Sequence, residues 1–263
     1  MSDPYVRPDV KAFLSILAAM PGPKMHELEP EAARAQYVAM KDLADPPVGE
    51  LGEIRDFTIP GPRGDIPARL FDPRASREPG PAVVFFHGGG FTIGNLDTHA
   101  SFTAEVARTL DLPVIAVDYA LAPEAKWPAG PDDAEAAARW VASSPTELGR
   151  AVTSLVLMGD SAGGNLTILT AIALRDQPAA APVIVQVPIY PATDSSKPYD
   201  SFDAFADGGF LLTRDGLKWF ADHYGADPDH PRTSPLLVDL ANLPSALVVT
   251  ASATLPIRAR IAR

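Results

Sequence analysis

The sequence predicts an α/β fold with a mostly parallel central sheet flanked by helices. Five short, continuous apolar runs are typical of strands buried on both faces, as in a parallel sheet. Helical stretches separate these runs, and this alternation predicts right-handed crossovers between parallel strands. The chain has 263 residues, of which 46% are hydrophobic, so a single domain can bury a large core. The predicted strands cover residues 82–88, 113–119, 154–160, 182–188 and 245–251.

The residues before the first of these strands predict two helices and a hairpin. Apolar residues recur at helical spacing in residues 9–20 and 31–43, and the sequence Pro-Gly-Pro separates the two stretches. Residues 53–60 and 65–72 alternate polar and apolar side chains on either side of a Gly-Pro-Arg-Gly turn. Such alternation is typical of an antiparallel hairpin with one exposed face.

The crossover helices are expected at residues 99–110, 129–143 and 162–175, between the apolar runs. Residues 192–235 break the alternation of strand and helix. They are rich in Pro, Asp and Gly, and helical spacing is found only at residues 214–224. We therefore expect residues 192–235 to be an insertion that lies above the ends of the strands.

Composition excludes several classes of function. The formal net charge is −11, which disfavours nucleic acid and anionic membrane surfaces as partners. The chain has no cysteine, so disulfides, thiolate catalysis and cysteine metal sites are excluded. No apolar run approaches the roughly 20 residues that span a bilayer, and residues 12–20 lack the positive leader of a signal peptide. We expect a protein that does not insert into membranes and resides in the cytoplasm.

A Gly-Asp-Ser-Ala-Gly motif at residues 159–163 marks Ser161 as a candidate nucleophile. The motif directly follows an apolar strand and directly precedes a helical stretch, the context in which a G-x-S-x-G turn lifts a serine out of a sheet. The flanking glycines permit the cramped turn, and the helix start directs amides and its positive dipole end toward bound negative charge. The motif also occurs by chance in glycine-rich turns, but the strand and helix around it favour a nucleophile.

A second glycine-rich segment follows another buried strand. Residues 87–90 read His-Gly-Gly-Gly, and three successive glycines can turn two backbone amides toward one point. An oxyanion hole is assembled in this way. The segment could instead be a flexible loop, but its occurrence upstream of the serine motif favours the oxyanion hole.

With these two motifs, the sequence resembles the bacterial hormone-sensitive-lipase-like esterases of the α/β-hydrolase superfamily. The resemblance also includes "YALAPEAKWPAG" and "SPLLVDLANLPSALVVTA", and it extends over nearly the whole chain. It implies hydrolysis of small-molecule esters with short acyl chains through a serine acyl-enzyme, without a metal or a cofactor. It further implies that residues 1–45 form a helical cap and that residues 46–250 form the hydrolase core.

The resemblance also implies a role for each motif residue. Ser161 would be the nucleophile, and the amides of Gly88, Gly89 and Ala162 would stabilise the oxyanion. In relatives, the histidine at the position of His87 shapes the glycine loop and takes no proton. The residues that support the two motifs are His87, Gly90, Gly159, Asp160, Gly163 and Gly164.

The histidine base is not evident in the sequence. In this superfamily the triad follows the chain order serine, acid, histidine, and only His223 and His230 follow Ser161. Aromatic neighbours predict that His223 belongs to a packed helix, and turn residues predict that His230 is exposed, so neither is expected to be the base. Of the earlier histidines, His99 is explained by a polar helix start, and His26 is expected in a loop near the cap.

The end of the chain departs from the family pattern. The family's acid follows the strand matched by residues 246–251, and its histidine comes later still, but here no Asp, Glu or His follows Asp239. We expect residues 251–263 to be an atypical tail, produced by a shifted reading frame near residue 251 or by another truncation. The last strand and helices of the fold would then be missing.

Little or no ester turnover is expected of such a chain, because a hydrolase without its base keeps only binding and oxyanion stabilisation. The alternative is a non-catalytic module that binds a small ligand on the same fold, although the intact serine and glycine motifs favour the esterase. Loss of the last strand would also expose a sheet edge at residues 246–251. Association into a homo-oligomer through this edge is therefore a further expectation.

Overall fold

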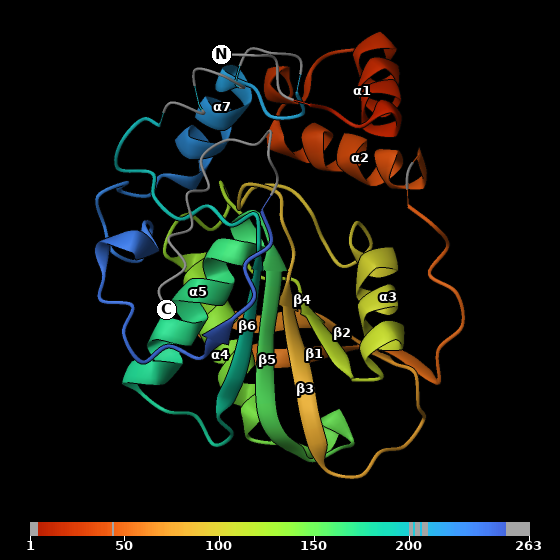
Figure 1. The fold of residues 1–263 in the computed structure, drawn as a ribbon, viewed down its shortest axis with the longest axis vertical. Helices are drawn as coiled ribbons and strands as arrows, with labels where there is room; N and C mark the ends of the chain where they lie inside the picture. Colours follow the sequence, from red (N-terminus) through yellow and green to blue (C-terminus); the bar gives the residue numbers. More distant parts are fainter. Residues whose placement is uncertain (1–4, 44, 200–201, 203–205, 207–209, 251–263) are drawn as a thin grey trace.

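The computed structural model describes residues 5–43, 45–199, 202, 206 and 210–250. In this part of the chain, seven strands form one sheet in the order β1-β2-β4-β3-β5-β6-β7, with helices on both faces (Figure 1). The predicted α/β fold with a mostly parallel sheet is confirmed.

The centre of the sheet is parallel. It comprises β3 (Gly80–Phe86), β4 (Val114–Val117), β5 (Val152–Asp160) and β6 (Val183–Ile189). Alternate residues of β3 contribute to two hydrophobic clusters, one on each face of the sheet, and every residue of β4 is buried. Burial on both faces explains why these strands are continuous apolar runs in the sequence.

The predicted hairpin forms the other side of the sheet. Strands β1 (Glu53–Gly61) and β2 (Gly64–Asp72) pair antiparallel from Glu53–Asp72 to Gly61–Gly64. β2 also pairs antiparallel with β4, so the hairpin joins the parallel strands directly. Asp72 therefore lies at the end of the sheet where the parallel strands begin.

Three crossover helices cover the two faces. α3 (Ala100–Leu110) packs on one face, whereas α4 (Ala129–Ala142) and α5 (Ala162–Asp176) pack together on the other (Figure 1). Small residues of α4 are fully buried, which lets this helix approach the sheet closely.

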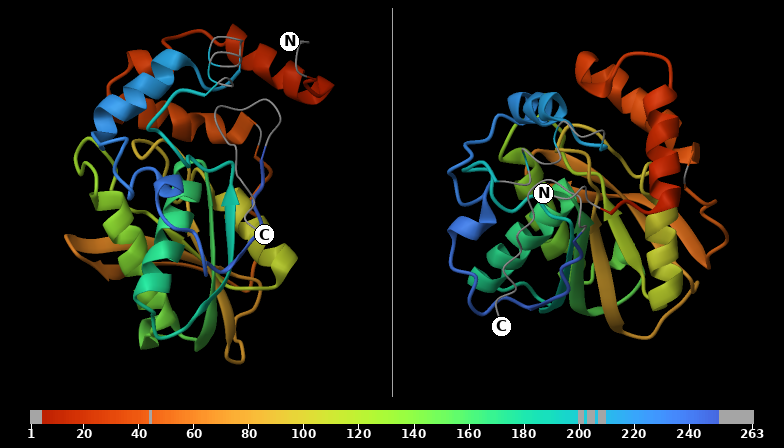
Figure 2. Two further views of the ribbon diagram at one scale, coloured as in Figure 1. Left: turned by 60° about the vertical axis from the view of Figure 1, so that its left-hand side comes forward. Right: turned by 45° about the horizontal axis from the view of Figure 1, so that its top comes forward.

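A separate layer of helices lies over the carboxyl ends of the parallel strands (Figures 1 and 2). It contains α1 (Pro8–Ala19), α2 (Pro30–Met40) and α7 (Arg214–Tyr224). The described residues also contain four short 3₁₀ turns: η1 (Met25–Glu27), η2 (Lys41–Leu43), η3 (Thr146–Leu148) and η4 (Pro235–Leu237). The sequence motifs around Ser161 and His87 lie beneath this layer.

The far side of the sheet is shorter than predicted. The strand expected at residues 245–251 is limited to β7 (Ser245–Ala246), followed by a single bridge from Val249 to Ile189. Leu247 is 61% exposed beside this edge. The predicted tail at residues 251–263 lies outside the described residues, and association through the edge stays a prediction. No helix in the described part of the chain is long and apolar enough to cross a membrane.

Candidate active site

Ser161 occupies a sharp turn between β5 and α5. Its backbone adopts φ 54° and ψ −114°, a conformation that costs on the order of 1–3 kcal/mol for a residue with a side chain. Hydrogen bonds hold the strained residue: its N–H donates to Ile189 O at 2.8 Å, and its carbonyl accepts from Asn165 N at 3.1 Å. At Gly163 a Cβ atom would collide with the carbonyl of Phe86, so only glycine permits α5 to begin this close to β3.

The glycine loop lies beside this turn because β3 and β5 are neighbours. Phe86, the last residue of β3, pairs with Gly159 of β5. The loop then reverses through Gly89 at φ 124° and Gly90 at φ 57°. The ring of Phe220 from α7 lies against Gly90, so the helical layer contacts the loop directly.

The backbone amides of the loop are not equivalent. The N–H of Gly88 donates to Asp160 Oδ1 at 2.8 Å. By contrast, the N–H groups of Gly89, Gly90 and Ala162 donate no hydrogen bond within the described residues. The oxyanion role that the resemblance implied for Gly88 therefore does not fit this geometry, because its only amide hydrogen is already bonded.

His87 is buried beneath the loop, with 2% of its surface exposed. Its Nδ1 donates to Gly88 O at 2.7 Å, and its ring stacks on Tyr119 with 4.5 Å between ring centroids. The Tyr119 hydroxyl donates to His87 O at 2.7 Å. These contacts fit a residue that shapes the glycine loop.

None of the five histidines, all of which lie in the described residues, is hydrogen-bonded to the Ser161 hydroxyl. In α7, His223 Nδ1 donates to Trp219 O at 2.7 Å. His230 accepts from Arg232 N at 3.0 Å and packs edge-on against Trp127, so the prediction that it is exposed is wrong. His26 lies in η1.

His99 is the site residue that sequence reasoning missed. It begins α3, but its side chain caps no amide of that helix. Instead its Nε2 lies 3.3 Å from Asp160 Oδ1, and both side chains are largely buried. The only signal in the sequence was topological, because α3 follows β3 and starts at the same end of the sheet as Ser161.

Two tyrosines share the environment of Asp160. Burial and the Asp160 charge raise the pKa of Tyr190, which follows β6, to about 12. The same two causes raise the pKa of Tyr37 from α2. Both phenols are therefore neutral hydrogen-bonding groups near neutral pH. No group of three or more His, Asp or Glu side chains in the described residues is arranged to hold a metal ion.

Arg34 fastens α2 over the glycine loop. Its guanidinium donates to Thr92 O and Ala122 O, each at 2.8 Å, and forms a bidentate pair with Glu124 at 2.7 and 2.8 Å. A cavity of about 290 Å³ lies beside this clamp. The cavity is lined by Arg34, Val38, Gly94, Asn95, Asp118, Tyr119 and Leu121.

Comparisons with known proteins give a consistent result. Residues 83–259 match the model of a family described as alpha/beta hydrolase fold. The carboxylic ester hydrolase LipN of Mycobacterium tuberculosis is 35% identical over 246 residues, which cover 90% of this chain and 58% of LipN. The carboxylesterase NlhH of the same organism is 38% identical over 264 residues, covering 95% of this chain and 81% of NlhH.

A solved structure shows the same likeness in three dimensions. The hyperthermophilic esterase from the archaeon Pyrobaculum calidifontis matches with a TM-score of 0.86 at 37% identity. This match covers 94% of this chain and 80% of that chain. The chain spans less than two thirds of the length of LipN and about four fifths of the lengths of the other two proteins.

Proposed function

The chain belongs to the α/β-hydrolase fold family whose model it matches, and from that premise we propose that it is a carboxylic ester hydrolase with Ser161 as its nucleophile. The observation that carries the proposal is the position of Ser161 in a strained strand-to-helix turn, next to backbone amides that have no acceptor in the described part of the chain. The relatives named as carboxylic ester hydrolases support the reaction class. Esters of short acyl chains are the proposed substrates.

In the proposed reaction the Ser161 Oγ attacks the carbonyl carbon of the ester. The tetrahedral oxyanion is stabilised by the N–H groups of Gly89, Gly90 and Ala162. The Gly90 amide replaces the Gly88 amide that the resemblance implied, because the Gly88 amide is already hydrogen-bonded. The carbon–oxygen bond to the alcohol then breaks, and the alcohol leaves with the proton lost by the serine. Water hydrolyses the acyl-enzyme and returns the proton to Ser161.

We further propose that this chain performs the reaction slowly on its own. None of the five histidines is hydrogen-bonded to the Ser161 hydroxyl, so the serine proton has no imidazole acceptor. In serine hydrolases that lose triad residues, a residual rate of about 10³–10⁴ over water comes from the oxyanion hole and substrate binding. The same level is expected here.

The test is chemical rescue of the absent base. Hydrolysis of p-nitrophenyl acetate by the wild-type chain is expected to be slow, and added imidazole should accelerate it, because free imidazole can accept the serine proton. The Ser161→Ala variant should show only the imidazole reaction in solution. A fast wild-type burst without imidazole would contradict the impaired turnover, and equal rates for wild type and variant would contradict the nucleophile.

The same absence of a histidine at Ser161 favours one alternative, a module that binds a small ligand without turnover. A fluorophosphonate reagent distinguishes the two, since it labels an activated serine covalently. Ser161-dependent labelling supports the hydrolase. A thermal shift with a small ester or acid, without labelling or rescue, supports the binding module.

A further inference from the structure

Asp160 connects three segments that are distant in the sequence. Its Oδ1 accepts the N–H of Gly88 at 2.8 Å, although 72 residues separate the two positions. The same oxygen lies 3.3 Å from His99 Nε2 at the start of α3. Asp160 also directly precedes Ser161 in the sequence. One carboxylate therefore contacts the glycine loop and lies next to the proposed nucleophile.

The glycine loop packs directly on this carboxylate. A Cβ atom at Gly88 would collide with Asp160 Oδ2, and it would also lie 3.1 Å from Asp160 O. No side chain therefore fits between the loop and the end of β5. The distance between the loop amides and Ser161 consequently depends on the Asp160 side chain.

We propose that Asp160 and His99 form a positioning pair for the oxyanion hole. Asp160 holds Gly88, and through Gly88 it fixes the following amides of Gly89 and Gly90 relative to the Ser161 hydroxyl. His99, whose Nε2 lies near the same oxygen, restrains the carboxylate so that Oδ1 stays aligned with the Gly88 N–H. The kinetic part of this inference rests on the proposed function, whereas the structural part does not.

The electrostatic surroundings explain why the carboxylate needs both neighbours. The negative charge of Asp160 helps to raise the pKa of Tyr37, Tyr119 and Tyr190, so its electrostatic effect extends across the site. A negative charge beside an oxyanion hole disfavours the oxyanion. The hydrogen bond from Gly88 and the nearby His99 ring draw part of that charge away. The useful property of the side chain is therefore its acceptor oxygen rather than its charge.

This reasoning separates two substitutions at one position. Asp160→Asn keeps an oxygen acceptor for Gly88 and removes the charge, whereas Asp160→Ala removes both. His99→Ala leaves the Gly88 bond possible but unsupported. A matched control is Asp133→Ala, because Asp133 is also a largely buried carboxylate that accepts a backbone N–H, from Ala120 at 2.9 Å.

The first measurement is hydrogen exchange at the Gly88 amide, followed by NMR in the full chain. Losing a hydrogen bond to a carboxylate should speed exchange at this amide at least about tenfold in Asp160→Ala. Asp160→Asn should restore most of the protection, and His99→Ala should give an intermediate rate. Asp133→Ala should leave Gly88 unchanged once exchange is corrected for global stability. This readout does not depend on activity.

The second measurement is the rate of labelling by a fluorophosphonate, whose phosphoryl oxygen occupies an oxyanion hole. Per folded molecule, Asp160→Ala should label about tenfold or more slowly than wild type, as expected for loss of one aligned hydrogen-bonded group. Asp160→Asn should label at a rate close to wild type. If wild type does not label even with added imidazole, the proposed function fails, and the exchange data alone decide the positioning pair.

Several outcomes would overturn the inference. One is unchanged exchange at Gly88 in Asp160→Ala. Another is protection lost equally in the Asn and Ala variants, because the acceptor oxygen would then have no role. A third is wild-type labelling that continues at the same rate in folded Asp160→Ala, which leaves the nucleophile assignment intact but removes the positioning role.

Discussion

Asp72 is a fully buried carboxylate and Asp160 a largely buried one at the opposite end of the sheet, and their surroundings differ. Asp72, at the end of β2, is fully buried and accepts from Arg77 Nε at 2.7 Å, from the Arg74 N–H at 2.8 Å and from Arg150. Asp160 accepts one backbone amide and lies 3.3 Å from the ring of one histidine, and its side chain is 14% exposed. The first carboxylate is surrounded by positive charge, and the second is not.

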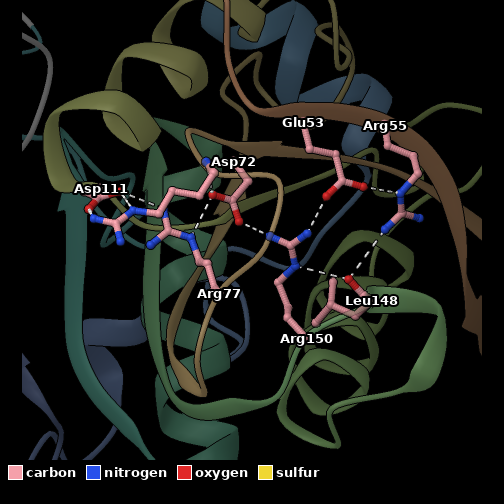
Figure 3. A network of polar contacts seen from close by, with 8 residues as sticks. Glu53, Arg55, Asp72, Arg77, Asp111, Leu148 and Arg150 are labelled. Carbon is pink, nitrogen blue, oxygen red and sulfur yellow. Dashed lines mark hydrogen bonds and ion pairs between the residues drawn. The ribbon is translucent and has the colours of Figure 1, made fainter.

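The contacts around Asp72 continue outward as a network (Figure 3). Arg150 also pairs with Glu53 and donates to Leu148 O, and Arg77 reaches Asp111. Charges at this end of the molecule are matched with each other. At the Ser161 end, by contrast, the amides of Gly89, Gly90 and Ala162 have no acceptor among the described residues. The difference separates an end of the sheet that contributes stability from an end that can bind an incoming anion or oxyanion.

Asp72→Ala should have the largest effect on stability. It leaves Arg77 and Arg150 partly buried without their shared partner, and breaking a buried ion pair in this way costs about 3–5 kcal/mol. Urea unfolding measures the loss. The exposed Asp176→Ala, which removes a surface pair with Arg175, is the control and should cost less than about 1 kcal/mol. Similar losses for both variants would mean that the network does not stabilise this end.

Gly163→Ala should have the next largest effect, at the opposite end. The added methyl meets the carbonyls of Phe86 and His87, and overpacking of a core position costs about 1–3 kcal/mol. The methyl would displace the backbone next to Ala162, so the rate at which a fluorophosphonate labels Ser161 should fall together with stability. Gly80→Ala, where the nearest atom is 3.7 Å away, is a matched control in β3. Full labelling by Gly163→Ala would show that the turn tolerates a shift.

The sequence predicted the Ser161 turn because its signals are local. A motif of five residues, the strand before it and the helix after it specify that geometry without any distant contact. The glycine loop was likewise predicted from residues 87–90. What could not be predicted was which amide is occupied, because the Gly88 bond depends on the pairing of β3 with β5.

His99 and the Asp72 network escaped prediction for the same reason. A histidine at a helix start is explained locally, and nothing near it in the sequence points to Asp160. Asp72 and Arg150 are 78 residues apart and meet only after the hairpin joins the sheet. Local patterns specify elements and turns, whereas charge partners are set by topology.

Acid should weaken the Asp72 end through Glu53. Burial alone would raise the pKa of Glu53, but Arg55 and Arg150 together lower it below its usual value of 4.5. A carboxyl with a lowered folded-state pKa stabilises the fold above the unfolded pKa, and this stabilisation is lost as the pH falls through the folded-state pKa. Glu53→Gln should therefore flatten the fall of unfolding free energy below about pH 4.5, by up to about 1 kcal/mol.

The control for that measurement is Glu78→Gln, since Glu78 has no hydrogen-bonded or ion-pair partner in the described residues. Its pH profile should match wild type. An unaltered profile for Glu53→Gln would mean that the arginines around Glu53 are satisfied equally well by a neutral amide.

Arg34→Lys should have the smallest effect on global stability and the most local one. Lysine keeps the charge opposite Glu124, which is worth up to about 1 kcal/mol at an exposed position, but it cannot also reach the carbonyls of Thr92 and Ala122 with a planar fork. Hydrogen exchange should therefore become faster in α2 and in the loop around Thr92, with little change in the urea midpoint. Amides near Asp72 should exchange as in wild type, because no contact of Arg34 extends to that end of the sheet. Faster exchange at both ends would contradict the division between them, since it would mean that the helical layer stabilises the whole molecule rather than the Ser161 end.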